Sequence, residues 1–351
     1  MKKVKYAMIG CGNFGKSHLK ELAAMECVEI IALCDTHIEA CEEKKSLFRL
    51  SANCYSDYRE LLEREKPDVV AIATSDQTHC EITVAALKAG CNVMCEKPMA
   101  LVNEECEKMV QTARECKKLL MIGQVCRYTP GFAKAKELVE SGVIGELTFV
   151  ESEYAHDYSD PKLKGVDHWR ATPEREPIIG GACHAIDLLR WIAGDPIETM
   201  AYSNHKSLPD WPINDTTVAI MKFPAQVIGK VFTSISCKRN YTMRTCIYGT
   251  KGTIIVNNTD PFLTLFLDAI EGQPFAAGQI KGLNEETVAH RIKVSLNNHN
   301  VAEEHKQMVA AILEGAPLLT PGEEGARTVA VCTAVVESAK SGKPIEIKYS
   351  V

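Results

Sequence analysis

The stretch "MIGCGNFG", Met8–Gly15, decides the fold of this chain. Gly10, Gly12 and Gly15 have G-x-G-x-x-G spacing, after the strand-forming run "KVKYAMIG" and before "GKSHLKELAAM", which has helical spacing. Asp35 ends the next apolar run, about 20 residues further on. A tight turn beside a strand-end aspartate is the structural alternative. The complete context favours a dinucleotide-binding βαβ unit.

Asp35 also predicts which dinucleotide is bound. Its carboxylate can accept hydrogen bonds from ribose hydroxyls and would repel a 2′-phosphate. Neither Thr36 nor His37 supplies the arginine that binds such a phosphate. NAD is therefore expected rather than NADP, with its pyrophosphate at the helix N-terminus. The candidate cofactor-binding residues of this region are Gly10, Gly12, Asn13, Phe14, Gly15 and Asp35.

The chain changes character near Gln124. Before it, almost fully apolar strands such as "PDVVAIAT" alternate with helices, which is typical of a parallel sheet covered on both faces. After it, "TTVAIMKFPAQVIGKVFTSIS" and "YTMRTCIYGTKGTIIVNN" predict consecutive strands. We expect an α/β Rossmann domain over 1–124 and an α+β domain with an open, mostly antiparallel sheet over 125–351.

Composition excludes several classes of function. The 351 residues carry a net charge of −6 without a basic run, which argues against nucleic acid as a partner. No apolar stretch has the length of a membrane span, and the first residues lack a cleavable signal pattern. The 15 cysteines form no C-x-x-C pair and are expected to be reduced, buried thiols. These features predict a cytoplasmic protein that does not bind membranes.

The segment "CEKPMAL" identifies a family. Together with the glycine loop, "IATSDQTHCEITVAALKAGCNVMCEKP" and "GTKGTI", it closely resembles the family of glucose–fructose oxidoreductase, inositol dehydrogenase and rhizopine-catabolism dehydrogenases (Gfo/Idh/MocA). The resemblance covers nearly the whole chain. It implies a Rossmann domain, and a second domain whose open sheet packs against another subunit in a dimer or tetramer.

The resemblance also assigns residues near the cofactor. It implies that Lys97 hydrogen-bonds a substrate hydroxyl beside the nicotinamide and that Pro98 fixes the turn. A solvated surface lysine is the alternative. Ser75 stands where the family often has proline, and a structural role competes with cofactor contact for His79. The candidates added here are Thr74, Ser75, His79, Glu96 and Lys97.

The segment "GGACHAIDLLRW", Gly180–Trp191, matches the family's glycine-led turn before a helix, where a histidine is the usual general base. His184 is expected to be that base, and a core histidine is the alternative. The family often has aspartate four residues earlier, where this chain has Gly180, so extra room is expected beside His184. Asp187, one helical turn further on, is expected to replace the missing acid.

Polar and aromatic residues from Tyr154 to Arg170 suit the wall of a sugar-binding cleft, although a structural loop is nearly as plausible for "DHWR". The candidate substrate-binding residues are Arg127, Tyr128, His168, Trp169 and Arg170. Cys183 and His184, with His168 or His156, lack recognisable ligand spacing, so no metal is expected.

The expected activity is oxidation by NAD of a secondary ring hydroxyl in a sugar, glycoside or cyclitol. Because the "GG-x-C-H" variant resembles a branch that oxidises glucosides, C3 of a glucoside is the first hypothesis. An NAD-using glycosidase with transient oxidation is a second, and a non-catalytic sensor or corepressor is a third. The presence of both Lys97 and His184 argues against the sensor, because a sensor needs no proton-transfer pair.

Overall fold

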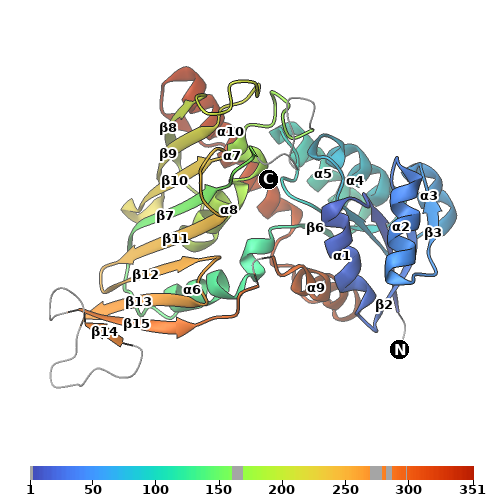
Figure 1. Ribbon diagram of the computed structural model, residues 1–351, viewed down its shortest axis with the longest axis horizontal. Helices are drawn as coiled ribbons and strands as arrows, with labels where there is room; N and C mark the ends of the chain where they lie inside the picture. Colours follow the sequence, from blue (N-terminus) through green and yellow to red (C-terminus); the bar gives the residue numbers. More distant parts are fainter. Residues whose placement is uncertain (1–2, 160–168, 269–278, 282–286, 298) are drawn as a thin grey trace. The chain divides into compact units, whose positions relative to one another are not determined.

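The computed structural model describes residues 3–159, 169–268, 279–281, 287–297 and 299–351 (Figure 1). The chain divides into two compact units. The first contains Met1–Val125, Asn300–Val329 and Ser350–Val351, and the second contains Cys126–His299 and Ala330–Tyr349. The first boundary lies between Val125 and Cys126, next to the one expected from the sequence. Residues 300–329 belong to the first unit rather than to one continuous second domain.

The first unit is built on a six-stranded parallel sheet with strand order β3-β2-β1-β4-β5-β6. Its strands are β1 (Val4–Ile9), β2 (Val28–Cys34), β3 (Asn53–Tyr55), β4 (Val69–Ile72), β5 (Asn92–Cys95) and β6 (Leu120–Ile122). The strands alternate with α1 (Asn13–Ala23), α2 (Ile38–Phe48), α3 (Tyr58–Glu65), α4 (His79–Lys88) and α5 (Asn103–Cys116). Strand order reverses between β1 and β4, which is the switch point where such sheets bind ligands. The predicted Rossmann fold is confirmed.

Complete burial of β4 explains its unbroken apolar sequence. Successive side chains of a strand point to opposite faces, so both faces of the sheet are covered. The returning segment covers the edge strand β6 as well: Ile122 N–H donates to the Thr320 carbonyl at 2.9 Å, and Met121 forms an antiparallel bridge with Pro321. Helix α9 (Val301–Glu314) packs against α1, and α10 (Gly322–Ser341) begins here and continues into the second unit.

The second unit contains a ten-stranded sheet with order β14-β15-β13-β12-β11-β7-β10-β9-β8-β16. Its strands are β7 (Leu147–Ala155), β8 (Glu198–Asn204), β9 (Thr216–Lys222), β10 (Ile228–Ser234), β11 (Thr242–Gly249), β12 (Gly252–Asn257), β13 (Phe262–Asp268), β14 (Gln279–Lys281), β15 (Thr287–Lys293) and β16 (Ile345–Glu346). Neighbouring strands are antiparallel except β7 and β10, which are parallel. The predicted mostly antiparallel sheet is confirmed.

Helices pack on one face of this sheet. They are α6 (Pro130–Glu140), α7 (Pro177–Gly180) and α8 (Cys183–Ala193). Buried and exposed residues alternate along β9, so its second face, which carries Val218 and Ile220, is solvent-exposed. Within the ranges described, no helix combines the length and apolar character of a membrane span.

Candidate functional site

The glycine loop leaves open space above its middle glycine. Gly10 has φ +94°, and a Cβ there would lie 2.5 Å from the Ala73 carbonyl oxygen. A Cβ at Gly15 would lie 2.0 Å from the Gly10 oxygen, so both positions require glycine. A Cβ at Gly12 would meet nothing within 4 Å, and α1 begins at the next residue without a side-chain cap. This geometry fits a pyrophosphate at a helix N-terminus.

Asp35 lies at the end of β2, and backbone groups hold its carboxylate. Oδ2 accepts from the Cys11 N–H at 2.8 Å, and Oδ1 accepts from the His37 N–H at 3.0 Å. The carboxylate is partly exposed and retains further acceptor capacity for ribose hydroxyls. His37 itself is exposed and stands beside this carboxylate. The residues present therefore fit an NAD adenosine ribose.

The loop after β4 contains the next candidates. Thr78 Oγ1 lies 2.8 Å from both Thr74 Oγ1 and the Ser75 carbonyl, which fixes the turn ahead of α4. His79, the first residue of α4, is buried, and its Nδ1–H donates to the Pro98 carbonyl at 2.9 Å. His79 thus hydrogen-bonds the turn that follows β5.

Glu96 and Lys97 follow the end of β5. Lys97 is half-buried, and its peptide bond to Pro98 is cis. Glu96 is buried, and its Oε1 lies 3.0 Å from Nε2 of His18, a residue that sequence reasoning missed. Half-buried Phe14 lies edge-on to the His18 ring. Because the cofactor candidates follow β1, β2, β4 and β5, they gather at one edge of the parallel sheet.

His184 is the second residue of α8 in the second unit. Its side chain is buried, and its backbone N–H donates to the Gly181 carbonyl at 3.3 Å. Its ring stacks on His299 with 6.0 Å between centroids, and Tyr241 lies 6.1 Å from the His299 ring. The candidate base therefore lies among other aromatic and imidazole side chains.

These neighbours form a Tyr–His group, defined as Tyr154, His156, Tyr158, Tyr241 and His299. Tyr154 Oη lies 3.2 Å from His156 Nδ1 and 3.0 Å from Tyr158 Oη. Burial raises the pKa of Tyr154 and of Tyr241 well above the ordinary tyrosine value, so both hydroxyls stay neutral. Neutral hydroxyls, imidazoles and ring faces suit a polyhydroxylated ligand. Tyr241 and His299 were not predicted from the sequence, because neither belongs to a recognisable motif.

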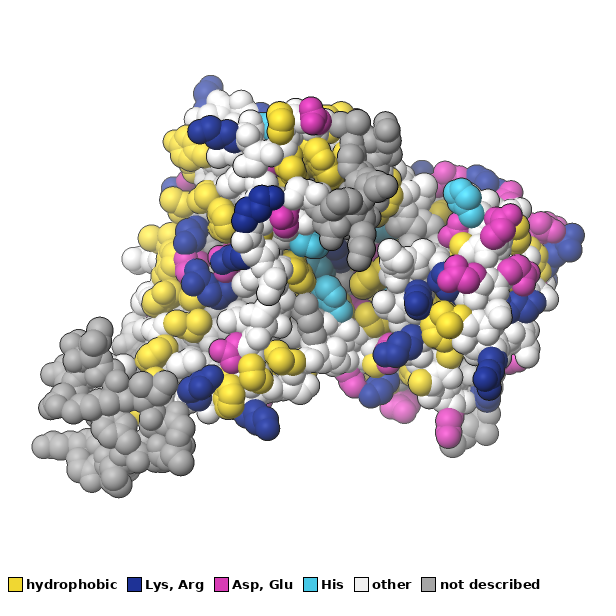
Figure 2. Space-filling model, viewed as in Figure 1, with side chains coloured by type: hydrophobic (Ala, Val, Ile, Leu, Met, Phe, Trp, Pro, Cys, Tyr) yellow, Lys and Arg dark blue, Asp and Glu magenta, His cyan; other side chains and the backbone are white. Residues whose placement is uncertain are grey.

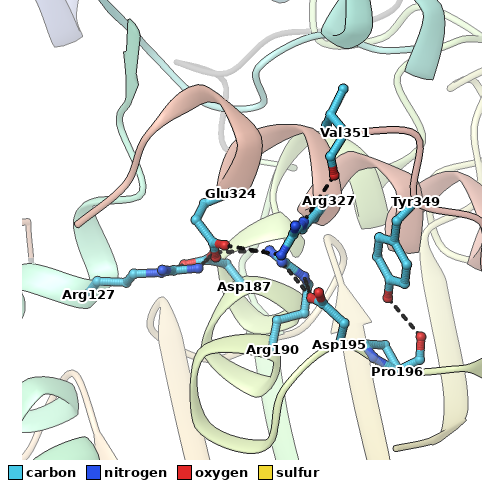
Figure 3. A network of polar contacts seen from close by, with 9 residues as sticks. All are labelled: Arg127, Asp187, Arg190, Asp195, Pro196, Glu324, Arg327, Tyr349 and Val351. Carbon is cyan, nitrogen blue, oxygen red and sulfur yellow. Dashed lines mark hydrogen bonds and ion pairs between the residues drawn. The ribbon is translucent and has the colours of Figure 1, made fainter. Parts of the chain in front are cut away.

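The structure corrects the expectation for Asp187. Its side chain is fully buried, Oδ2 accepts from Arg127 Nε at 2.9 Å, and Oδ1 accepts from Arg127 Nη2 at 2.7 Å (Figure 3). Arg190 Nη1 lies 3.9 Å from the same carboxylate. Both oxygens of the Asp187 carboxylate thus accept hydrogen bonds from Arg127, which gives this side chain a structural partner that the sequence did not predict. Arg127, expected to face the substrate, is buried in this ion pair, and Tyr128 beside it is half-buried.

The structure also corrects the expectation of extra room at Gly180. A Cβ there would lie 2.2 Å from Arg175 Nη1, and Arg175 Nη2 donates to the Gly180 carbonyl at 3.0 Å. The buried Arg175 guanidinium fills this space and lies over the Trp169 ring, as Arg170 also does. Trp169 and Arg170 are half-buried. His168 lies outside the described residues.

The described ranges contain no group of three or more His, Cys, Asp or Glu side chains that could hold a metal ion.

Two family models match the chain. "Oxidoreductase family, NAD-binding Rossmann fold" covers residues 4–124, and "GFO/IDH/MocA C-terminal domain" covers residues 132–255. Together they account for most of both units.

Similar proteins are sugar and cyclitol dehydrogenases. Inositol 2-dehydrogenase of Salmonella typhimurium is 27% identical over 252 residues, which are 71% of this chain and 72% of that protein. D-glucoside 3-dehydrogenase of Escherichia coli is 29% identical over 199 residues, 55% of each chain. The solved structure of levoglucosan dehydrogenase with NADH and L-sorbose superposes with a TM-score of 0.88 at 23% identity, covering 99% of this chain and 100% of that one.

Proposed function

Because the chain belongs to the Gfo/Idh/MocA oxidoreductase family, in which it is related to NAD-dependent sugar and cyclitol dehydrogenases, we propose that it oxidises C3 of a glucoside. The products are the 3-keto glycoside, NADH and a proton. Similarity to a D-glucoside 3-dehydrogenase favours this carbon. A keto group at C3 acidifies the neighbouring C–H, which prepares the molecule for later elimination of the aglycone.

The proposed reaction needs two separate transfers. The glycine loop and Asp35 would hold NAD, which would supply the acceptor for the hydride of that carbon. His184 takes the hydroxyl proton, because an imidazole is the side chain that most often serves as a general base. Lys97 orients the same hydroxyl and stabilises developing negative charge on its oxygen. Asp35 favours NAD over NADP.

The observation that carries the proposal is the position of His184 beside the Tyr–His group. Four hydroxyl or imidazole side chains, Tyr154, His156, Tyr158 and Tyr241, form a hydrogen-bonding and ring-packed set in the same unit. A histidine held only for packing needs no such polar surroundings. A pyranose offers both hydroxyls for these polar atoms and C–H faces for the rings.

The test is incubation of the protein and NAD with methyl and aryl glucosides, free sugars and inositols. NADH absorbance is followed, and the carbonyl is located by NMR. A 3-keto glucoside formed together with NADH supports the proposal. Activity confined to inositols, or oxidation at C1, overturns it. Glycoside cleavage without NADH accumulation would identify the NAD-using glycosidase, and NAD binding without any turnover would identify the sensor.

We also infer a homo-oligomer formed through the open sheet face of the second unit. Tyr202, Val218, Ile220, Ile228 and Tyr248 are exposed along neighbouring strands. Figure 2 shows hydrophobic side chains interspersed with lysine and arginine over this sheet. An exposed apolar face of this kind marks an interaction surface. Light scattering should give a dimer or tetramer, and Ile220→Glu should yield smaller species.

A cytoplasmic location belongs to the same proposal. All 15 cysteines are free thiols, and most are buried as small apolar side chains. Thiols persist in a reducing compartment. Fractionation of the native host with NADH-linked activity as the marker checks this location.

A further inference from the structure

A buried pair of histidines links the helix after the glycine loop to the Glu96–Lys97 turn. His18 Nε2 lies 3.0 Å from Glu96 Oε1, and His18 Nδ1 lies 2.9 Å from His305 Nε2. The side chains come from α1, the end of β5 and α9, all in the first unit. His18 is 2% exposed and His305 is fully buried.

The surroundings of His305 determine its protonation state. Burial and the neighbouring His18 lower the pKa of His305 well below the ordinary value, so His305 is neutral. A carboxylate oxygen accepts hydrogen bonds, so His18 Nε2–H donates to Glu96 Oε1. The contact between His18 Nδ1 and His305 Nε2 holds the other side of the imidazole ring.

Glu96 also contacts the backbone of the next residue, Lys97. Its Oε2 accepts the backbone N–H of Lys97 at 3.2 Å, and its own backbone N–H donates to the Ile72 carbonyl at 3.0 Å. A Cβ at Gly123 would lie 2.7 Å from Oε1, so the carboxylate is packed directly against the Gly123 backbone. The carboxylate thus lies between the imidazole on one side and the Lys97 backbone on the other.

We propose that His18, held in place by His305, is a positioning residue that acts through Glu96 to fix Lys97. This role rests on the proposed function, which assigns Lys97 to the substrate hydroxyl. Without the imidazole N–H, the buried carboxylate lacks one of its two donors and turns toward another, and the backbone of Lys97 moves with it. A lysine displaced by even a fraction of an ångström orients the hydroxyl less well.

A matched pair of substitutions separates the two hydrogen bonds of His18. His18→Gln places an amide N–H near the Nε2 position and keeps the contact with Glu96. His18→Asn reaches only the Nδ1 position, and so it keeps His305 and loses Glu96. Tyr6→Phe is the control, because the Tyr6 ring packs edge-on against His305 while its hydroxyl contacts no polar partner among the described residues.

The kinetic test compares kcat, KM and the Kd of NAD for the three variants. His18→Asn should lose about ten-fold or more in kcat with the Kd of NAD within two-fold, since one hydrogen bond to a charged group is lost. His18→Gln should recover most of that loss, and Tyr6→Phe should match the wild type. A folded His18→Asn with normal kcat overturns the role, as does a loss confined to NAD affinity.

A second readout needs no turnover. Reductive ¹³C-methylation of lysines gives one NMR signal for each, and Lys97→Arg identifies the Lys97 signal. The signal should shift or broaden in His18→Asn and remain unchanged in His18→Gln and Tyr6→Phe. An unchanged signal in His18→Asn overturns the positioning role. A wild type without activity on any polyol, combined with a displaced Lys97 signal, would refute the proposed substrate while retaining this role.

Discussion

Two helices of this protein begin after glycine-led turns, and the space beside the glycines differs. Before α1, a Cβ at Gly12 would meet nothing within 4 Å. Before α8, a Cβ at Gly180 would lie 2.2 Å from Arg175, and one at Gly181 would lie 2.6 Å from the Tyr154 ring. Glycine leaves space for a ligand in the first unit, whereas in the second the protein's own side chains use that space.

The largest effect should come from the histidine that follows the second turn. His184→Ala should lower kcat by roughly 10²–10⁴-fold while leaving the Kd of NAD unchanged, because the proposed general base is removed. His205→Ala is the control: this exposed histidine of the same unit bonds the Leu208 carbonyl and should keep normal kinetics. Steady-state rates with the best glucoside distinguish a catalytic role of His184 from a packing role. Near-normal turnover by His184→Ala would return His184 to a packing role.

The buried ion pair on α8 gives the next largest effect. Asp187→Ala leaves the Arg127 guanidinium buried without its carboxylate and should cost about 3–5 kcal/mol in the free energy of unfolding. Arg127→Lys should also destabilise, because lysine cannot make the two parallel hydrogen bonds. Arg114→Ala breaks an exposed pair with Glu323 and should cost less than about 1 kcal/mol.

Urea unfolding monitored by fluorescence measures these differences. A normally stable Asp187→Ala with greatly reduced kcat would reverse the conclusion and restore Asp187 as the acidic partner of His184. Loss of stability without a specific loss of rate in the folded fraction supports the structural role.

The same contrast explains what the sequence could predict. The glycine loop, Asp35 and the Glu96–Lys97 turn are contiguous motifs between regular elements, so local spacing specifies both the fold and their place at one sheet edge. The contacts around His184 join residues distant in sequence. Arg127 contacts Asp187, and Tyr241, just before β11, lies near His299, in the loop before α9. Contacts between residues this far apart in the sequence leave no local sequence pattern.

The returning segment was unpredictable for a related reason. The helical pattern of 301–314 identifies a helix with one buried face, and that pattern is the same whichever unit supplies the partner. The contact between Ile122 and Thr320 places the segment on the first sheet. His305 and its partner His18 were missed together because each reads as an ordinary helix residue.

The preference for NAD or NADP tests the ligand-binding role of the first turn, the glycine loop before α1. Asp35→Ala should weaken NAD binding by about ten-fold or more, because hydrogen bonds from the ribose to a charged group contribute roughly 1.5–3 kcal/mol. The wild type should prefer NAD to NADP in kcat/KM. Equal or better use of NADP by the wild type would refute the role given to this carboxylate.

Substituting the glycines themselves tests the comparison directly. Gly12→Ala should cost less than about 1 kcal/mol of stability, since its Cβ meets open space, and should weaken NAD binding where the pyrophosphate approaches. Gly180→Ala should cost about 1–3 kcal/mol, because the buried Arg175 must shift. Its NAD affinity should remain normal. Calorimetric Tm and NAD titration of both variants would show the opposite pattern if the second turn were the open one.

Buried acids distinguish the two units as well. Asp187 is paired with arginine, whereas both carboxyl oxygens of fully buried Glu304 in α9 lack a hydrogen-bond partner among the residues described. Burial, with the negative charge of Glu96, raises the pKa of Glu304 well above the ordinary value. The folded protein therefore holds a proton on Glu304 that the unfolded chain releases above about pH 4.3.

A pH-dependent change in stability follows from that proton. As pH rises above about 4.3 toward the folded-state pKa, unfolding releases a proton, so stability falls by at most about 1.4 kcal/mol per pH unit from this group. Glu304→Gln cannot titrate and should gain stability relative to the wild type between pH 5 and 8. Glu303→Gln, which changes the adjacent exposed carboxylate paired with Lys306, should show no such trend. A pH-independent difference between wild type and Glu304→Gln would mean that Glu304 is ionised in the folded protein.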